Sequence, residues 1–164
     1  MIIRKEIHNL PPKNFLVQYD KEKEEYYGVE VQDFVMTEKI YGAKQKEEDI
    51  KKWLTYFNSR EKNMGILLSG IKGGGKNLLA KQLMLEAKLP VLIINEPFHG
   101  NKFQEFIGNV DQEAVVFFDE FEKVYKERED QEKLLSLFDG VISSKKIFLL
   151  TTNQDNINEY FINK

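Results

Sequence analysis

Apolar and polar residues alternate in two short segments near the N-terminus. A period of two is typical of strands that bury one face. A run of charged residues, 21–25, separates the two segments and is typical of a solvent-exposed turn. The pattern therefore predicts a β-hairpin. The alternating apolar residues are Phe15, Val17 and Tyr19 in the first segment and Tyr27, Val29 and Val31 in the second.

Beyond residue 42 the period changes. Apolar residues at Ile50, Trp53, Leu54 and Phe57 have the i, i+3, i+4, i+7 spacing of an amphipathic helix. Continuous apolar runs, typical of strands covered on both faces, then alternate with helical patterns. This alternation predicts a parallel α/β sheet with right-handed crossovers. The predicted strands lie near 66–68, 91–94, 115–118 and 147–150, and the predicted helices near 79–87, 103–107 and 134–141.

Two domains are expected from this change of pattern. Residues 1–40 form the N-terminal β-hairpin extension, and residues 41–164 form the α/β core. A chain of 164 residues is long enough to bury a substantial core.

Composition narrows the class of protein. With 24 basic and 27 acidic residues the net charge is −3, which argues against a chain-wide basic surface for nucleic acid. The absence of cysteine excludes disulfides and thiolate metal sites and fits a reducing, cytoplasmic location. Two histidines do not suffice for a multi-histidine zinc site. No apolar run approaches the roughly 20 residues of a membrane span, so no membrane partner is expected.

The stretch from Gly70 to Asn77 carries the most specific chemistry. It follows the first predicted core strand and has the spacing G-x-x-x-x-G-K of a phosphate-binding loop. Its glycines, Gly73, Gly74 and Gly75, allow backbone amides to converge on phosphate oxygens at a helix N-terminus. Lys76 can neutralise β- and γ-phosphate charge. The alternative is a glycine-rich turn with a surface lysine, which the strand–loop–helix context disfavours.

Two acids, Asp119 and Glu120, follow the strand predicted at 115–118. Because ligands of α/β folds bind at the carboxyl ends of the strands, the acids are expected near the phosphate loop. Asp119 would hold Mg²⁺, directly or through water, and Glu120 would orient the attacking water or accept its proton. The alternative is a strand that simply ends in a polar loop. The separation of 43 residues from Lys76 favours the catalytic interpretation.

A third polar group, Asn153, ends the next predicted strand. Its side chain could hydrogen-bond the attacking water or the γ-phosphate. Thr and Asn also commonly start turns, so a structural role is the alternative.

In this order the three motifs resemble those of the AAA+ family of P-loop ATPases, over about residues 40–161. The resemblance implies a three-layer P-loop α/β sandwich with a mostly parallel sheet, and ATP and Mg²⁺ as cofactors. It makes Glu120 and Asn153 catalytic, and Asp119 and Asn77 metal ligands. The nucleotide-binding residues that it implies are Gly70, Gly73, Gly74, Gly75, Lys76 and Asn77 at the phosphates and Ile40, Tyr41 and Gly42 at the adenine.

Two departures from the family pattern stand out. Asn77 replaces the usual Ser or Thr at the metal, so hydrolysis is expected to be slow while binding survives. The chain also ends at Lys164, before the family's fifth strand, arginine finger and helical lid. We therefore expect either a fragment of a longer protein or a chain that needs a partner, with the first core strand left at the edge of the sheet. None of the three arginines, Arg4, Arg60 and Arg128, stands at the finger position.

The resemblance also points to a pore loop in residues 96–102. There Phe98 and Lys102 would grip a translocating polymer. The alternative is that Phe98 packs under its own loop.

These features favour an ATP-binding, Mg-dependent ATPase module of AAA+ type. It would work in a homo-oligomeric ring that remodels or moves a protein or a nucleic acid. The isolated chain is expected to turn over weakly, because an arginine finger contributes about 10³–10⁵ in rate. The alternative is a nucleotide-binding switch or interaction module with little or no hydrolysis. A small-molecule kinase is disfavoured by the scarcity of arginine.

Overall fold

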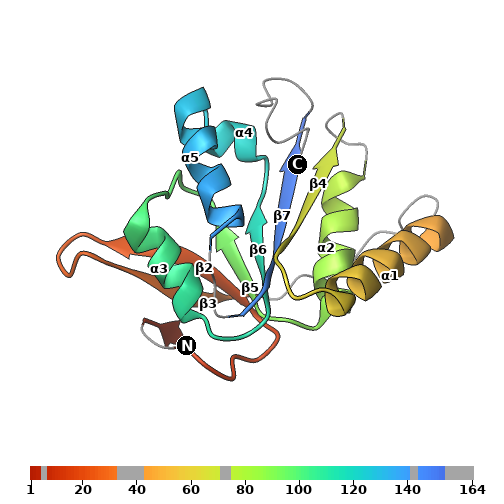
Figure 1. Cartoon of the computed structure of the whole chain (residues 1–164), viewed down its shortest axis with the longest axis horizontal. Helices are drawn as coiled ribbons and strands as arrows, with labels where there is room; N and C mark the ends of the chain where they lie inside the picture. Colours follow the sequence, from red (N-terminus) through yellow and green to blue (C-terminus); the bar gives the residue numbers. More distant parts are fainter. Residues whose placement is uncertain (5–6, 33–42, 71–74, 141–143, 154–164) are drawn as a thin grey trace.

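The described part of the chain forms one seven-stranded sheet with helices on both faces (Figure 1). The computed structural model describes residues 1–4, 7–32, 43–70, 75–140 and 144–153. The elements are β1 (Ile2–Ile3), β2 (Asn14–Asp20), β3 (Glu25–Val31), α1 (Ala43–Ser59), β4 (Met64–Ser69), α2 (Lys76–Ala87), β5 (Val91–Ile94), α3 (Asn101–Asn109), β6 (Ala114–Phe118), α4 (Phe121–Val124), α5 (Arg128–Phe138) and β7 (Lys146–Thr152).

The strands are ordered β1-β3-β2-β5-β6-β7-β4. Four of the six pairings are parallel, and the two that involve β3 are antiparallel. The predicted fold class, a mostly parallel α/β sandwich with an N-terminal hairpin, is confirmed. Within the described residues β4 is an outermost strand, as expected.

The N-terminal hairpin continues the core sheet. Strands β2 and β3 pair from Asn14 with Val31 to Asp20 with Glu25, and β2 also pairs in parallel with β5. The proposed division at residues 40 and 41 falls in the segment 33–42, outside the described residues, and stays a prediction.

Two hydrophobic layers hold the helices to the sheet. Helices α1 and α2 cover one face, and α3, α4 and α5 cover the other (Figure 1). Because successive residues of a strand point to opposite faces, each central strand supplies both layers, which explains its continuous apolar sequence. The layer under α1 and α2 includes Ile66, Leu68, Val115, Phe117, Ile147 and Leu149. The opposite layer includes Leu92, Ile94, Val116, Phe118, Phe148 and Leu150.

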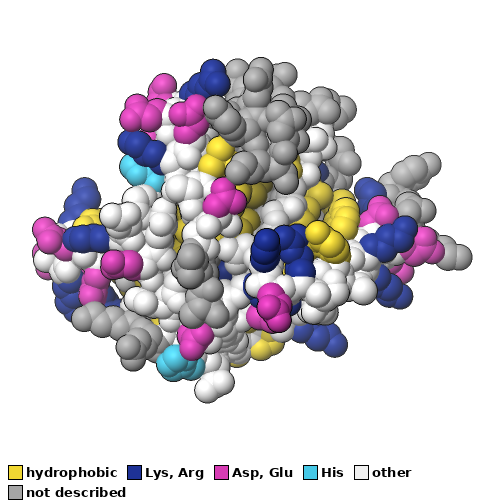
Figure 2. Space-filling view, in the orientation of Figure 1, with side chains coloured by type: hydrophobic (Ala, Val, Ile, Leu, Met, Phe, Trp, Pro, Cys, Tyr) yellow, Lys and Arg dark blue, Asp and Glu magenta, His cyan; other side chains and the backbone are white. Residues whose placement is uncertain are grey.

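The surface carries charges of both signs. On the face in Figure 2, acidic and basic side chains lie side by side over the hairpin and over α1. Of the helices in the described ranges, none has the length and apolar character needed to cross a bilayer.

The lysine at the start of β7 is buried in the core. Lys146 is fully buried, and its Nζ donates to the carbonyls of Val110 (2.9 Å) and Ser144 (2.6 Å). Burial disfavours the charged form and lowers the pKa of Lys146 to about 8, although Asp111 and Glu113 act in the opposite direction.

We expect Lys146 to make stability depend on pH. Between about pH 8 and the ordinary lysine value of 10.5, the unfolded chain binds more protons than the folded protein. The free energy of unfolding should therefore rise with pH in this window, by about 3 kcal/mol relative to Lys146→Met. Urea denaturation on both sides of the window measures this difference, with the exposed Lys51→Met as control. If wild type and Lys146→Met differed in free energy of unfolding by the same amount on both sides of the window, the lowered pKa of Lys146 would be wrong.

Candidate functional site

The carboxyl ends of three strands meet at one edge of the sheet. Ser69 of β4 lies opposite Thr152 of β7, and the N–H of Gly70 donates to the Thr152 carbonyl at 3.2 Å. On the other side of β7, strand β6 ends at Phe118, opposite Leu150. The residues that follow these strands are therefore held close together, as parallel strands require.

The phosphate-loop sequence leads from β4 into helix α2. Gly75, directly before the helix, has a φ of 88°, which favours glycine over any residue with a side chain. Lys76 opens the helix and is 92% buried, since its exposed fraction is 8%, while Asn77 in the same turn is exposed. The middle of the loop, residues 71–74, lies outside the described residues, and with it the predicted contacts of Gly73 and Gly74.

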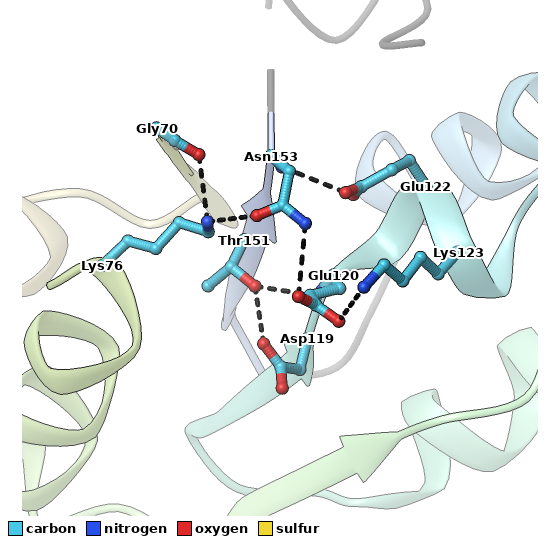
Figure 3. Close-up of polar contacts among 8 residues, drawn as sticks. All are labelled: Gly70, Lys76, Asp119, Glu120, Glu122, Lys123, Thr151 and Asn153. Carbon is cyan, nitrogen blue, oxygen red and sulfur yellow. Dashed lines mark hydrogen bonds and ion pairs between the residues drawn. The ribbon is translucent and has the colours of Figure 1, made fainter. Parts of the chain in front are cut away.

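A chain of polar contacts joins three of the predicted residues (Figure 3). The Lys76 ammonium donates to the carbonyl of Gly70 at 3.0 Å and to Oδ1 of Asn153. The Asn153 Nδ2 in turn donates to Oε1 of Glu120 at 3.3 Å. An ammonium can only donate and a carboxylate can only accept, so an amide with its oxygen toward Lys76 and its nitrogen toward Glu120 satisfies both.

Glu120 has an unusual backbone conformation. Its φ of 46° and ψ of 56° lie in the left-handed region, at a cost of about 1–3 kcal/mol for a residue other than glycine. Its N–H donates to Thr151 Oγ1 at 2.7 Å, and Lys123 Nζ lies 3.0 Å from its Oε2. The contact from β7 thus holds the backbone of Glu120, and the contact from α4 holds its carboxylate, at the edge of the sheet. Strain of this kind is concentrated at functional sites.

Asp119, the other predicted acid, is exposed and has one carboxylate oxygen engaged. Thr151 Oγ1 donates to its Oδ1 at 2.7 Å, so Thr151 bonds both acids in succession. In the described residues no three His, Asp or Glu side chains form a metal cluster by themselves. Mg²⁺ typically takes one or two carboxylates and completes its shell with water and substrate phosphates. The exposed Asp119 fits that mode of binding.

Sequence reasoning missed several contacts of this site. Sequence analysis assigned no role at this site to Thr151 or to Lys123. Glu122 Oε1 accepts the backbone N–H of Asn153 at 3.0 Å, whereas its Oε2 is buried with no hydrogen-bond partner in the described residues. For Glu122 and Lys123 the short spacing from the two acids was the available signal, but their side-chain direction depends on helix α4, which the pattern did not predict. Thr151 is 31 residues from Glu120 in the sequence, so only its place near the end of the neighbouring strand could have indicated the contact.

Two further predictions concern the surroundings of the site. The adenine contacts expected from Ile40, Tyr41 and Gly42 lie outside the described residues. In the expected pore loop, Phe98 packs its ring against Tyr26, with centroids 4.9 Å apart. This packing supports the alternative, a structural role for Phe98, and the pore-loop role stays a prediction.

The same packing involves Tyr125. Its hydroxyl donates to the Phe98 carbonyl at 2.6 Å, and burial raises the pKa of Tyr125. The other expected pore-loop residue, Lys102, is exposed. Its Nζ lies 3.9 Å from Oε2 of Glu24 in the hairpin turn.

Comparison with known proteins adds an independent line of evidence. A family model described as "ATPase family associated with various cellular activities (AAA)" matches residues 66–163. A Plasmodium falciparum (isolate 3D7) protein named as a candidate cell division cycle ATPase is 30% identical over 72% of this chain and 12% of its own length. The mouse (Mus musculus) protein "Nuclear valosin-containing protein-like" is 32% identical over 57% of this chain and 13% of its own length. The chain thus spans about an eighth of these relatives.

Proposed function

This chain belongs to the AAA family of ATPases, and from that premise we propose that it binds Mg·ATP at the carboxyl edge of the sheet and hydrolyses it. The observation that carries the proposal is the chain of contacts from Lys76 through Asn153 to Glu120. An ammonium for the phosphates and a carboxylate for the attacking water are joined there by one amide, which suits phosphoryl transfer by positioning and electrostatics.

Each side chain has a distinct role in this proposal. Lys76 and the loop amides bind the β- and γ-phosphates, while Asp119 and Asn77 hold Mg²⁺, which neutralises phosphate charge when bound. Glu120 orients the attacking water and accepts its proton, and Asn153 fixes the position of the Glu120 carboxylate. Thr151 supports both acids from β7.

The larger role that we propose is that of an oligomeric motor. The ring would remodel or translocate a protein or a nucleic acid, as the resemblance to this family implies. All three arginines of the chain are engaged elsewhere: Arg4 with Glu25 at 2.8 Å, Arg60 over the ring of Tyr56, and Arg128 with Glu132. With these contacts none of the three acts as an arginine finger within the chain, which supports weak turnover by the chain alone.

One observation favours a second candidate, a nucleotide-binding switch with little or no hydrolysis. Lys123 pairs with Glu120 at 3.0 Å, and Asn153 occupies the other carboxylate oxygen. With both oxygens already engaged, the carboxylate is less available to accept a hydrogen bond from an attacking water. Exposed Asn77, in place of a hydroxyl residue, supports the same alternative.

Removing the Lys76 ammonium tests the binding step. We expect Lys76→Ala to weaken ATP binding in the presence of Mg²⁺ by about 10- to 100-fold, because a charge-assisted hydrogen bond contributes about 1.5–3 kcal/mol. Isothermal titration calorimetry measures the affinity. Lys81→Ala, on the same helix α2 but outside the contacts described, is the matched control and should bind as the wild type does. A wild-type chain that binds no nucleotide would overturn the proposed function.

A further inference from the structure

A second lysine lies beside the phosphate loop, on a different element from Lys76. A pocket of about 290 Å³ is bounded by the end of β4, the start of α2 and Lys46 of α1. Helices α1 and α2 lie next to each other on this face of the sheet (Figure 1). The residues that line the pocket are Lys46, Leu67, Leu68, Ser69, Gly70, Gly75, Lys76 and Leu79.

The Lys46 ammonium faces the backbone of the loop. Its Nζ lies 3.4 Å from the position that a Cβ on Gly75 would occupy. The absence of a side chain at residue 75 thus leaves the ammonium close to the main chain where the loop enters α2. Among the described residues, Lys46 has no hydrogen-bond or ion-pair partner. Lys46 also lines the pocket, so its ammonium can reach a ligand that enters there.

The charges around the pocket favour a negatively charged ligand. Two ammonium groups, those of Lys46 and Lys76, line the pocket, and no carboxylate is among its lining residues. Like charges in one partly enclosed space repel each other, and an anion between them removes the repulsion. Ser69 and the backbone of Gly70 add polar groups to the pocket.

We propose that Lys46 is a second cationic contact for the phosphates of the nucleotide, a role that rests on the proposed function. Lys76 is directed toward Gly70 and Asn153, that is, toward the acids. Lys46 approaches instead from α1, four residues after the segment expected at the adenine. It therefore contacts a phosphate nearer to the ribose than the one that Lys76 neutralises, and it contributes to ADP and ATP binding alike.

The test compares nucleotide affinities of single variants. Lys46→Met should weaken ADP and ATP binding by the same factor, about tenfold, and the loss should shrink at high ionic strength. Lys46→Arg should retain most of the affinity, since it keeps the charge. Lys51→Met, an exposed lysine of the same helix, is the matched control and should leave both affinities unchanged.

The outcomes separate this inference from the proposed function. If the wild type binds nucleotide and Lys46→Met binds equally well, the role of Lys46 is wrong while the proposed function stands. A loss for ATP alone would also overturn it, because the contact would then be at the terminal phosphate. If the wild type binds neither ADP nor ATP, both proposals fail. Thermal denaturation of each variant shows whether the fold is retained.

Discussion

Replacing Glu120 by Gln is expected to reduce ATP turnover by about 10²- to 10⁴-fold while leaving ATP binding intact. Gln keeps the shape of the side chain and an oxygen that can accept from Asn153 Nδ2, but it cannot take a proton from water. The phosphate contacts of Lys76 do not depend on the charge of residue 120. Binding and turnover should therefore separate in this variant.

The measurement is phosphate release in single turnover, with protein in excess of ATP, because the isolated chain is expected to be slow. Glu129→Gln is the matched control: Glu129 is exposed on α5, where it pairs with Lys133 at 3.2 Å. Equal turnover in wild type and Glu120→Gln would exclude Glu120 as the base. Binding without turnover in either protein would favour the non-hydrolysing switch.

The largest loss of stability is expected from Phe148→Ala. Phe148 is fully buried in β7, between β6 and β4, and its ring stacks on Phe138 with centroids 4.7 Å apart. Truncation removes apolar contact and leaves a cavity, at a cost of about 3–5 kcal/mol. That is a large part of the 5–15 kcal/mol by which a typical domain is stable.

Urea denaturation, followed by circular dichroism, measures the free energy of unfolding of this variant. Leu85→Ala is the control, because Leu85 is 42% exposed on α2 and its loss should change stability by less than about 0.5 kcal/mol. A loss below about 1 kcal/mol for Phe148→Ala would mean that β7 is not the centre of the core.

The elements that the sequence predicted are those whose pattern is repeated over several residues. Continuous apolar runs located β4, β5, β6 and β7, because both faces of each strand are covered. The stripe that includes Ile50 and Phe57 located α1, and both residues are buried. Strand β1 has two residues and helix α4 has four, so neither is long enough to show a period.

Sequence reasoning could place the main site residues but not their contacts. The candidate residues come after strands that the pattern predicts, and the carboxyl ends of neighbouring parallel strands lie close together. These residues are Lys76, Asp119, Glu120 and Asn153. The parallel pairing of β2 with β5 and the approach of Lys46 to Gly75 join segments far apart in the chain. No local pattern encodes such pairings, since they depend on how the complete sheet and its helices pack.

The carboxamide of Asn153 is a small dipole aligned in the field of two opposite charges. Its oxygen points to the Lys76 cation and its nitrogen to the Glu120 anion. An aspartate at residue 153 would present two like charges to each other and lose this alignment. An anion that drew the Lys76 cation away would leave only the contact with Glu120 to orient the carboxamide. The orientation of the Asn153 side chain beside Glu120 would therefore depend on what is bound at Lys76.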